Sequence, residues 1–71
     1  MSNMEQITLF TITSCIDCYK MKQHLKVKNI PFEEVNLMEQ PDRQDELIKV
    51  AGEFNVPFLV GGKKALSLED L

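Results

Sequence analysis

The first 37 residues switch between two hydrophobic periods, and this switch restricts the fold more than any other feature of the sequence. Residues 6–11 read as a strand whose two faces are both largely apolar, as in a strand covered on both sides. A helical pattern then begins near Cys15, and a second short strand follows around Phe32, Val35 and Leu37. Strand, helix and strand within about 30 residues predict a right-handed βαβ unit with parallel strands.

The expected first helix carries signals at both of its ends. Ser14 and Asp17 have the spacing of a capping box, in which side-chain oxygens satisfy amide donors at a helix start. Asn29 suits a left-handed stop position, and Pro31 prevents the helix from continuing. One face of the helix is apolar and consists of Cys18, Met21 and Leu25.

A second helix is expected in the middle of the chain. It opens at Pro41 or Asp42, where acidic residues favour a first turn, and it stops at Gly52. Its expected apolar positions are Leu47, Ile48, Ala51 and Phe54.

The rest of the chain predicts a β-hairpin and the start of a last helix. Residues 58–60 form a short apolar strand, Gly61–Gly62 a turn, and residues 63–66 a return strand. Ser67 and Asp70 repeat the capping-box spacing, yet one residue follows. We therefore expect one α/β domain over residues 1–71, a βαβ-α-ββ core with a truncated final helix.

Charge and hydropathy exclude several classes of function. The net charge of −3 offers no cationic field for a nucleic-acid backbone or an anionic membrane. No apolar run approaches the roughly 20 residues of a membrane span, and residues 1–5 lack the pattern of a signal peptide. The expectation is a cytoplasmic protein that binds neither nucleic acid nor membrane.

The two cysteines are the candidate catalytic residues. A disulfide between Cys15 and Cys18 would close too short a loop to stabilise the fold much, and the cytosol keeps thiols reduced. Cys15 falls at a helix start, where amides and the helix dipole stabilise a thiolate, and Cys18 lies one turn inward. Asp17 opposes that negative charge, and Lys20 and Lys22 partly offset it. We expect Cys15 to be the nucleophile and Cys18 the resolving thiol.

A metal site is the alternative use of the same cysteines. A structural zinc ion needs four ligands, and His24 is the one other good candidate, so a site within one chain is not expected. A metal or Fe–S cluster shared between two chains stays open, which makes a non-enzymatic carrier the second hypothesis. Tyr19 either lines the site or is a half-buried surface aromatic residue.

Val56–Pro57 is the second informative position. Pro57 lacks an amide hydrogen and would disturb a central strand unless it occupies the first position, which is where it falls. From the residues alone, a trans proline that starts a strand is the simplest interpretation, because cis X–Pro bonds are uncommon.

The order of these elements and motifs, from Ile7 to about Leu71, strongly resembles a glutaredoxin. The resemblance implies the thioredoxin fold, with Pro57 cis and facing Cys15. It also implies that the backbone of Val56 pairs with the cysteine portion of glutathione or of a substrate peptide. Val56 and Pro57, together with Asp70, are the expected substrate- or glutathione-binding residues.

The sequence departs from the glutaredoxin pattern at three places. Ile16–Asp17 replaces the common Pro-Tyr pair, and Ile12 stands where a basic residue usually helps to bind glutathione. Leu66–Ser67 replaces a Gly-Gly pair, which leaves Glu69 or Asp70 to supply the acidic residue that holds the glutamyl amine. These changes raise a likeness to the glutaredoxin-like hydrogen donors of ribonucleotide reductase, which take electrons from a flavoprotein thioredoxin reductase.

The resemblance implies a redox-active thiol–disulfide oxidoreductase that serves electron transport and cell redox homeostasis. Its expected partners are proteins that contain disulfides, together with glutathione or a thioredoxin reductase-type flavoprotein as the electron donor. No bound cofactor and no metal ligand are expected, and glutathione is a candidate reductant.

Overall fold

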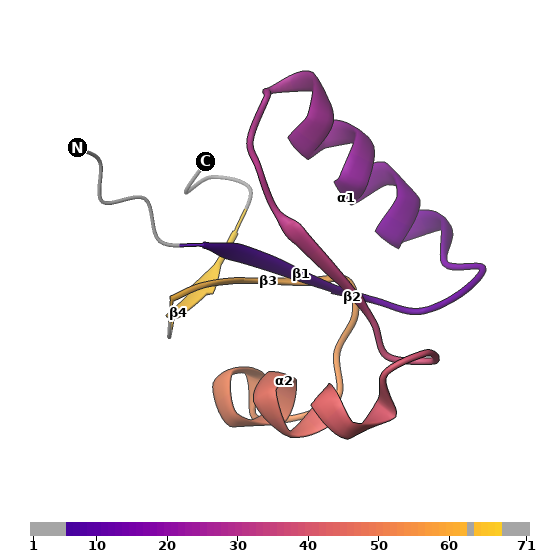
Figure 1. Ribbon diagram of the computed structural model, residues 1–71, viewed down its shortest axis with the longest axis vertical. Coiled ribbons are helices and arrows are strands. Elements are labelled where there is room, and N and C mark those ends of the chain that lie inside the picture. The colour runs from indigo at the N-terminus through magenta and orange to yellow at the C-terminus, as the bar shows by residue number, and fades with distance from the viewer. Residues whose placement is uncertain (1–5, 63, 68–71) are drawn as a thin grey trace.

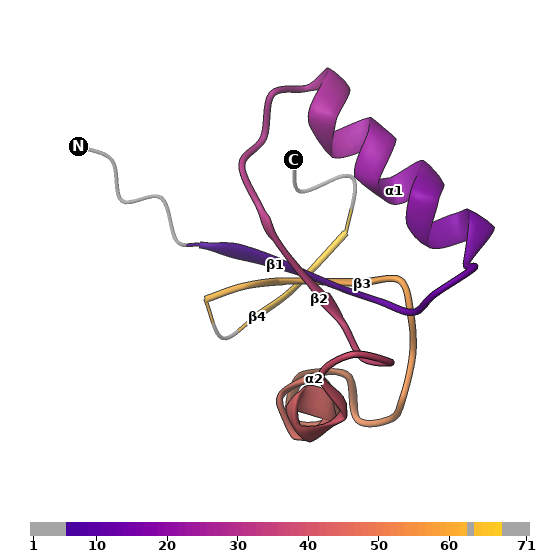
Figure 2. The ribbon, with the colours of Figure 1, turned by 45° about the vertical axis from the view of Figure 1, so that its right-hand side comes forward.

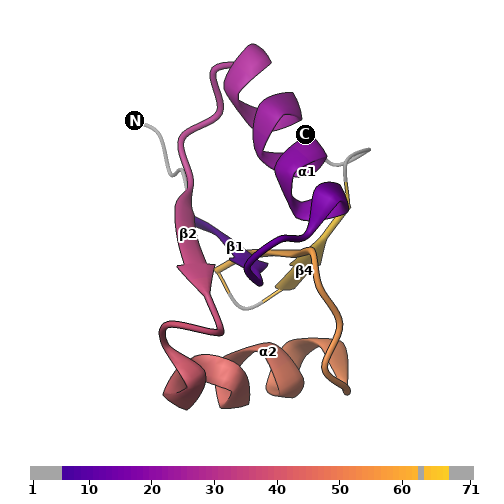
Figure 3. The ribbon, with the colours of Figure 1, turned by 90° about the vertical axis from the view of Figure 1, so that its right-hand side faces the viewer.

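A four-stranded mixed sheet lies between two helices in the computed structural model, which describes residues 6–62 and 64–67 (Figure 1). Helix α1 lies over one face of the sheet and α2 over the other, as the turned views show (Figures 2 and 3). A short 3-10 turn, η1, leads into α2. In chain order the elements are β1 (Ile7–Thr11), α1 (Ile16–Val27), β2 (Glu33–Asn36), η1 (Pro41–Arg43), α2 (Gln44–Ala51), β3 (Phe58–Gly61) and β4 (Lys64–Leu66).

The strand order is β2-β1-β3-β4. Strand β1 runs parallel to β2, with Thr11 opposite Asn36, which confirms the predicted βαβ unit. Strand β1 also pairs with β3 in the antiparallel sense, with Phe10 opposite Phe58, and β3 pairs with β4 in the same sense. This register brings Val56–Pro57, just before β3, to the edge of the sheet where β1 ends and the cysteine loop begins.

Strand β1 has two apolar faces because each face packs against a separate core. Leu9 is fully buried with Leu25 of α1 and Leu59 of β3, while Phe10 faces the α2 side. Each such side chain contributes about 1.5–3 kcal/mol when it is removed from water. The cluster around Phe10 consists of Val35, Leu37, Leu47 and Val60. The second strand is shorter than expected, and Phe32 and Leu37 pack into the cores from just beyond its ends.

The capping box predicted at the start of α1 is wrong. Ser14 has a φ of 63°, a left-handed conformation that turns the chain out of β1, so its side chain does not cap the helix. Cys15 has an extended backbone and is the N-cap instead, because its sulfur accepts a hydrogen bond from the Cys18 amide. The cap therefore moves by one residue, and it is a thiol rather than a hydroxyl group.

The predicted end of α1 is confirmed. Asn29 adopts the left-handed conformation with a φ of 58°. Its amide donates to the carbonyl of Lys26 at 3.0 Å, and the amide of Ile30 donates to the carbonyl of Leu25 at 2.9 Å. This pair of hydrogen bonds is a Schellman motif, which satisfies carbonyl groups that the end of a helix leaves without partners.

Helix α2 begins later and ends earlier than the apolar pattern indicates. Pro41 opens η1, and Gly52 ends α2 with a φ of 83°, as expected of a C-terminal glycine. Phe54 was expected on the apolar face, but it lies beyond the helix end and is 47% exposed. Ile48 is also exposed, so the helix buries mainly Leu47 and packs Ala51 against the core.

The predicted hairpin is present. Gly62 occupies the turn with a φ of 64°, and the return strand is observed from Lys64, since Lys63 lies outside the described residues. A side chain at Gly61 would place a Cβ 2.6 Å from Leu66 Cδ1, so a larger residue there would require the Leu66 side chain to shift. The capping signal of Ser67 and Asp70 extends beyond the described residues. Among the helices of residues 6–62 and 64–67, none has the length and hydropathy to cross a membrane.

Candidate functional site

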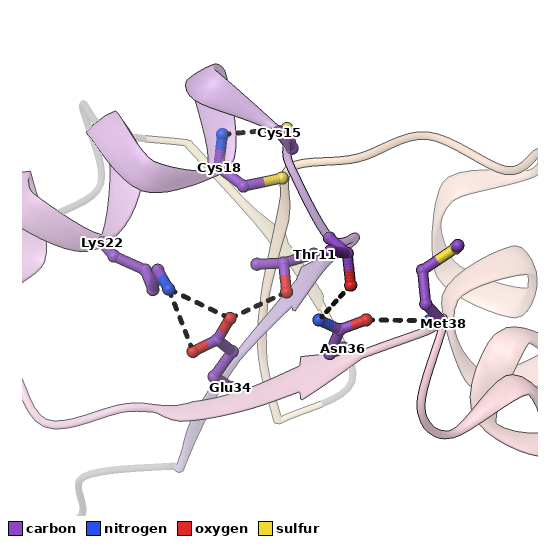
Figure 4. A network of polar contacts seen from close by, with 8 residues as sticks. Thr11, Cys15, Cys18, Lys22, Glu34, Asn36 and Met38 are labelled. Atoms are coloured by element: carbon purple, nitrogen blue, oxygen red, sulfur yellow. Dashed lines mark hydrogen bonds and ion pairs between the residues drawn. The ribbon is translucent and has the colours of Figure 1, made fainter.

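Cys15 lies at the amino end of α1, directly after the loop that leaves β1 (Figure 4). Its Sγ accepts a hydrogen bond from the backbone amide of Cys18 at a donor–acceptor distance of 3.0 Å. Both cysteines are free thiols, and Cys15 is partly exposed. An amide that points at a sulfur atom at the positive end of a helix dipole supports negative charge on that sulfur. Cys15 is thus accessible to a disulfide, and its sulfur lies at the helix start beside an amide donor.

Cys18 lies one turn further along α1 and faces the sheet, where it is 2% exposed. The pKa of the Cys18 thiol is raised to about 11, mainly by burial and next by its hydrogen bond with the Cys15 side chain. Near neutral pH, Cys18 is therefore a neutral thiol. The two cysteines thus differ in exposure, and their roles as an outer nucleophile and an inner resolving thiol stay a prediction.

A polar network of three side chains lies beside the cysteines (Figure 4). The hydroxyl group of Thr11 donates to Glu34 Oε2 at 2.9 Å, and Lys22 Nζ lies 3.3 Å from both oxygens of the same carboxylate. Lys22 thus pairs with Glu34, whereas the sequence led us to expect it to offset Asp17. Sequence analysis missed Glu34 as a site residue, because its approach to Thr11, 23 positions away, depends on the pairing of β1 with β2.

Asn36 connects the end of β2 to the cysteine loop. Its side-chain amide donates to Thr13 Oγ1 at 3.2 Å, and its Oδ1 accepts from the Met38 amide at 2.8 Å (Figure 4). Thr13 lies two residues before Cys15. These contacts hold the loop that carries Cys15 against the neighbouring strand.

An open cleft of about 570 Å³ lies on the β2 side of the cysteine pair. Both cysteines line it, as does Tyr19, which is 55% exposed and so belongs to the site as well as to the surface. The charged residues of the lining are Lys22, Glu34 and Glu39. Because Lys22 and Glu34 pair with each other, Glu39 leaves the cleft with a net negative charge.

The expected binding residues fall in two places. The Val56–Pro57 peptide bond is cis, as the resemblance to glutaredoxins implied, and both residues precede β3 at the edge where β1 leads to Cys15. Neither residue lines the cleft on the β2 side. Asp70 and Glu69 lie outside the described residues, so their role stays a prediction.

The described part of the chain contains no group of three or more His, Cys, Asp or Glu side chains that could hold a metal ion. The candidate ligand His24 is half-buried on α1, and its Nε2 has no hydrogen-bond partner among these residues. The expectation that one chain does not build a zinc site with the cysteines and His24 stays a prediction.

Comparison with known proteins adds three findings. The family model named Glutaredoxin matches residues 7–65. The crystal structure of the glutaredoxin grx-1 from Archaeoglobus fulgidus superposes with a TM-score of 0.75 at 20% sequence identity, covering 90% of this chain and 75% of that one. The thioredoxin-like protein BC3987 gives a TM-score of 0.77 at 21% identity, covering 87% and 85% of the two chains. At these identities the two structures show a shared fold.

A curated relative points to another kind of protein. The global transcriptional regulator Spx 1 of Oceanobacillus iheyensis is 39% identical over 44 residues, which are 62% of this chain and 34% of that protein. The chain thus spans about a third of the length of this relative. The similarity covers a shared segment of 44 residues and does not carry over the activity of the whole regulator.

Proposed function

Because this chain belongs to the glutaredoxin family and is, in general terms, a thiol–disulfide oxidoreductase, we propose that it reduces mixed disulfides of proteins or of glutathione by dithiol exchange. The observation that carries the proposal is the unequal placement of the two thiols. Cys15 is accessible and its sulfur receives an amide hydrogen bond, whereas Cys18 is buried one turn away. This is the arrangement that a two-step exchange requires.

The reaction proceeds in two displacements. The Cys15 thiolate attacks one sulfur of the substrate disulfide, forms a mixed disulfide and releases the first thiolate, which takes up a proton. The Cys18 thiol then loses its proton and attacks the Cys15 sulfur, which releases the second substrate thiol and leaves a Cys15–Cys18 disulfide. An external thiol reductant returns two electrons and two protons and restores the dithiol.

The electron donor is either glutathione or a thioredoxin reductase-type flavoprotein. Ile12 occupies the position of the basic residue that binds the glutathione carboxylate in the family, and Lys22 of the cleft is engaged with Glu34. These two features support the flavoprotein as the donor. On the other side of the site, the cis Val56–Pro57 bond retains the backbone arrangement on which a glutathione moiety or a substrate peptide would pair.

The donor is tested by measuring reduction of a small disulfide with glutathione plus glutathione reductase and, separately, with thioredoxin reductase. We expect faster turnover with thioredoxin reductase. Turnover with the glutathione system and none with thioredoxin reductase would contradict that part of the proposal. Cys15→Ser should be inactive with both donors. Cys18→Ser should stop at a mixed disulfide that mass spectrometry detects as an added substrate mass.

The proposal of dithiol exchange fails if Cys15→Ser retains the activity of the unmodified protein. It also fails if protein prepared without added metal contains a stoichiometric metal that protects both thiols from alkylation. The second result would establish the alternative from the sequence, a metal or Fe–S carrier that shares its cysteines between two chains.

A further inference from the structure

Glu34 joins three elements around the resolving cysteine (Figure 4). It lies on β2, accepts a hydrogen bond from Thr11 at the end of β1, and pairs with Lys22 of α1. Thr11 is 1% exposed, while the side chains of Lys22 and Glu34 are 28% and 33% exposed. The carboxylate therefore has one buried donor and one partly exposed cation, and both of these favour its ionised form.

Cys18 and Glu34 line the same cleft. The groups that surround Cys18 come from every element packed against it. Thr11 ends β1, and Ile12, just after the strand, supplies a backbone hydrogen bond; neither residue carries a charge. Besides Cys18, the titratable groups of the cleft are Cys15 at the N-cap, Tyr19 and Lys22 of α1, Glu34 of β2 and Glu39 beyond β2.

The electrostatic effect of Glu34 on Cys18 has a definite sign. A negative charge near a thiol disfavours the thiolate, so it adds to the effect of burial, which is the largest cause of the raised pKa of Cys18. The hydrogen bond from Ile12 acts in the opposite direction. Lys22 weakens the effect of the Glu34 carboxylate on Cys18, because its ammonium group lies 3.3 Å from the carboxylate and cancels part of the carboxylate's electric field.

We propose that Glu34 is a positioning residue whose charge, from the same cleft, disfavours the Cys18 thiolate and slows its attack, and that Lys22 sets the strength of this effect. The inference rests on the proposed dithiol exchange. A neutral Cys18 leaves Cys15 as the attacking sulfur and delays the second displacement until the mixed disulfide has formed. When the second displacement occurs, the Cys18 proton passes to solvent, the Cys18 sulfur bonds to Cys15, and the substrate thiolate leaves and is protonated.

The test removes the opposite charges of Glu34 and Lys22 one at a time and together. In a Cys15→Ser background, thiolate absorbance is titrated against pH to give the pKa of Cys18 alone. Glu34→Gln should lower this pKa by about 0.5, the size expected of a partly exposed charge, and Lys22→Gln should raise it. The double variant Glu34→Gln/Lys22→Gln should lie close to the starting value. A purely structural role would shift the two single variants in the same direction.

Glu33→Gln is the matched control. Glu33 precedes Glu34 on β2, but its carboxylate reaches Arg43 on the α2 side of the sheet, at 3.3 Å. This variant removes the same charge from the same strand and should leave the pKa of Cys18 unchanged. An equal fall in the Glu33→Gln and Glu34→Gln variants would overturn the proposal, because it would show a general charge effect.

A kinetic measurement in the two-cysteine protein gives the second readout. Cys15 is first loaded with a chromophoric aromatic thiol, whose release reports the attack by Cys18. Below the pKa of Cys18, Glu34→Gln should speed release about twofold, because a threefold gain in thiolate is partly offset by lower nucleophilicity. Lys22→Gln should slow it by a similar factor. Unchanged or same-sign rates in both variants would overturn the inference.

The experiments on Glu34 and the experiments on the proposed function can fail independently of each other. The titration does not require turnover, so an unchanged pKa would reject the role of Glu34 while the dithiol reaction stands. Full activity of Cys15→Ser would reject the reaction whatever the titration shows.

Discussion

The two helices of this protein begin and end by different means, although they cover opposite faces of the same sheet. Helix α1 starts with the sulfur of Cys15 as its cap and ends in a Schellman motif around Asn29. Helix α2 has no side-chain cap at its start, where Arg43 bonds to Glu46, and it ends at Gly52. At the start of α1, a cysteine thiol occupies the cap position that a hydroxyl, amide or carboxylate side chain usually fills. The start of α2 depends instead on the ion pairs of Arg43.

The difference shows how the chain places a reactive thiol without a large loss of stability. The first backbone amides of any helix lack intrahelical acceptors. A cap sulfur that accepts a hydrogen bond from one of them is therefore held in place by a contact that also stabilises the helix. The α2 end of the molecule carries no such group, and its Arg43 contacts tie η1 and α2 to β2 through Glu33.

The largest expected effect is that of Cys15→Ser. Disulfide reduction should fall to background, because a hydroxyl group does not replace a thiolate, yet the serine oxygen can accept the Cys18 amide hydrogen bond. The unfolding free energy should therefore stay within about 0.5 kcal/mol of the unmodified protein. The test is turnover of a small disulfide together with urea unfolding of the reduced proteins.

Cys15→Ala is the comparison for that variant. It should lose activity and also about 1 kcal/mol of stability, because alanine does not cap the helix. Equal stabilities of the serine and alanine variants would show that the sulfur–amide bond contributes nothing to the helix.

Gly52→Ala addresses the end of α2. The position has a φ of 83°, and nothing lies within 4 Å of a Cβ placed there, so backbone strain is the whole cost. We expect a loss of about 1 kcal/mol in unfolding free energy, with disulfide reduction unchanged. Asn29→Gly is the matched change at the end of α1 and should raise stability slightly, since glycine adopts the left-handed conformation more readily than asparagine.

Arg43→Gln tests the ion pairs at the start of α2. It removes contacts to Glu46 at 2.8 Å and to Glu33 at 3.3 Å, whose carboxylates are about half exposed. The loss should be about 0.5–1 kcal/mol at low salt and should shrink as salt increases. A loss that does not change with salt would show that the arginine acts through packing of its side chain.

The smallest effect is the pH dependence of the same contact. The hydrogen bonds from Arg43 lower the pKa of Glu46 below its ordinary value, so the folded state binds this proton less tightly than the unfolded state does. The stabilisation is therefore complete above the ordinary glutamate pKa of about 4.3. It is lost as the pH falls through the lower pKa that Glu46 has in the folded protein. Unfolding of the unmodified protein and of Glu46→Gln, measured from pH 7 to pH 3, should show two stabilities that converge in acid.

The apolar pattern and the positions of glycine, asparagine and proline were enough to predict most of the fold. The two-faced β1, the βαβ unit, the hairpin and the left-handed stops at Asn29 and Gly52 are all confirmed. Each of these depends on residues close together in the chain, where backbone preference and hydrophobic period act directly. The glutaredoxin-like order of motifs extended the same local information to the cis peptide before Pro57.

Errors arose where neighbours in space, rather than in sequence, decide the outcome. The turn out of β1 puts Ser14 in a left-handed conformation and passes the cap to Cys15. Helix α2 stops before Phe54 and leaves that ring exposed.

The amino-acid sequence by itself determined the spacing of the cysteines, the strand and helix that flank them, and hence the dithiol character of the site. The tertiary structure decided which charged side chains share the cleft with the cysteines. Glu34 reaches the site because the parallel register of β1 and β2 sets it beside Thr11, and because α1 crosses the same face with Lys22. Glu34 is 23 positions from Thr11 and 12 positions from Lys22 in the sequence. Contacts over such separations arise from packing of whole elements, so no local pattern of residues encodes them.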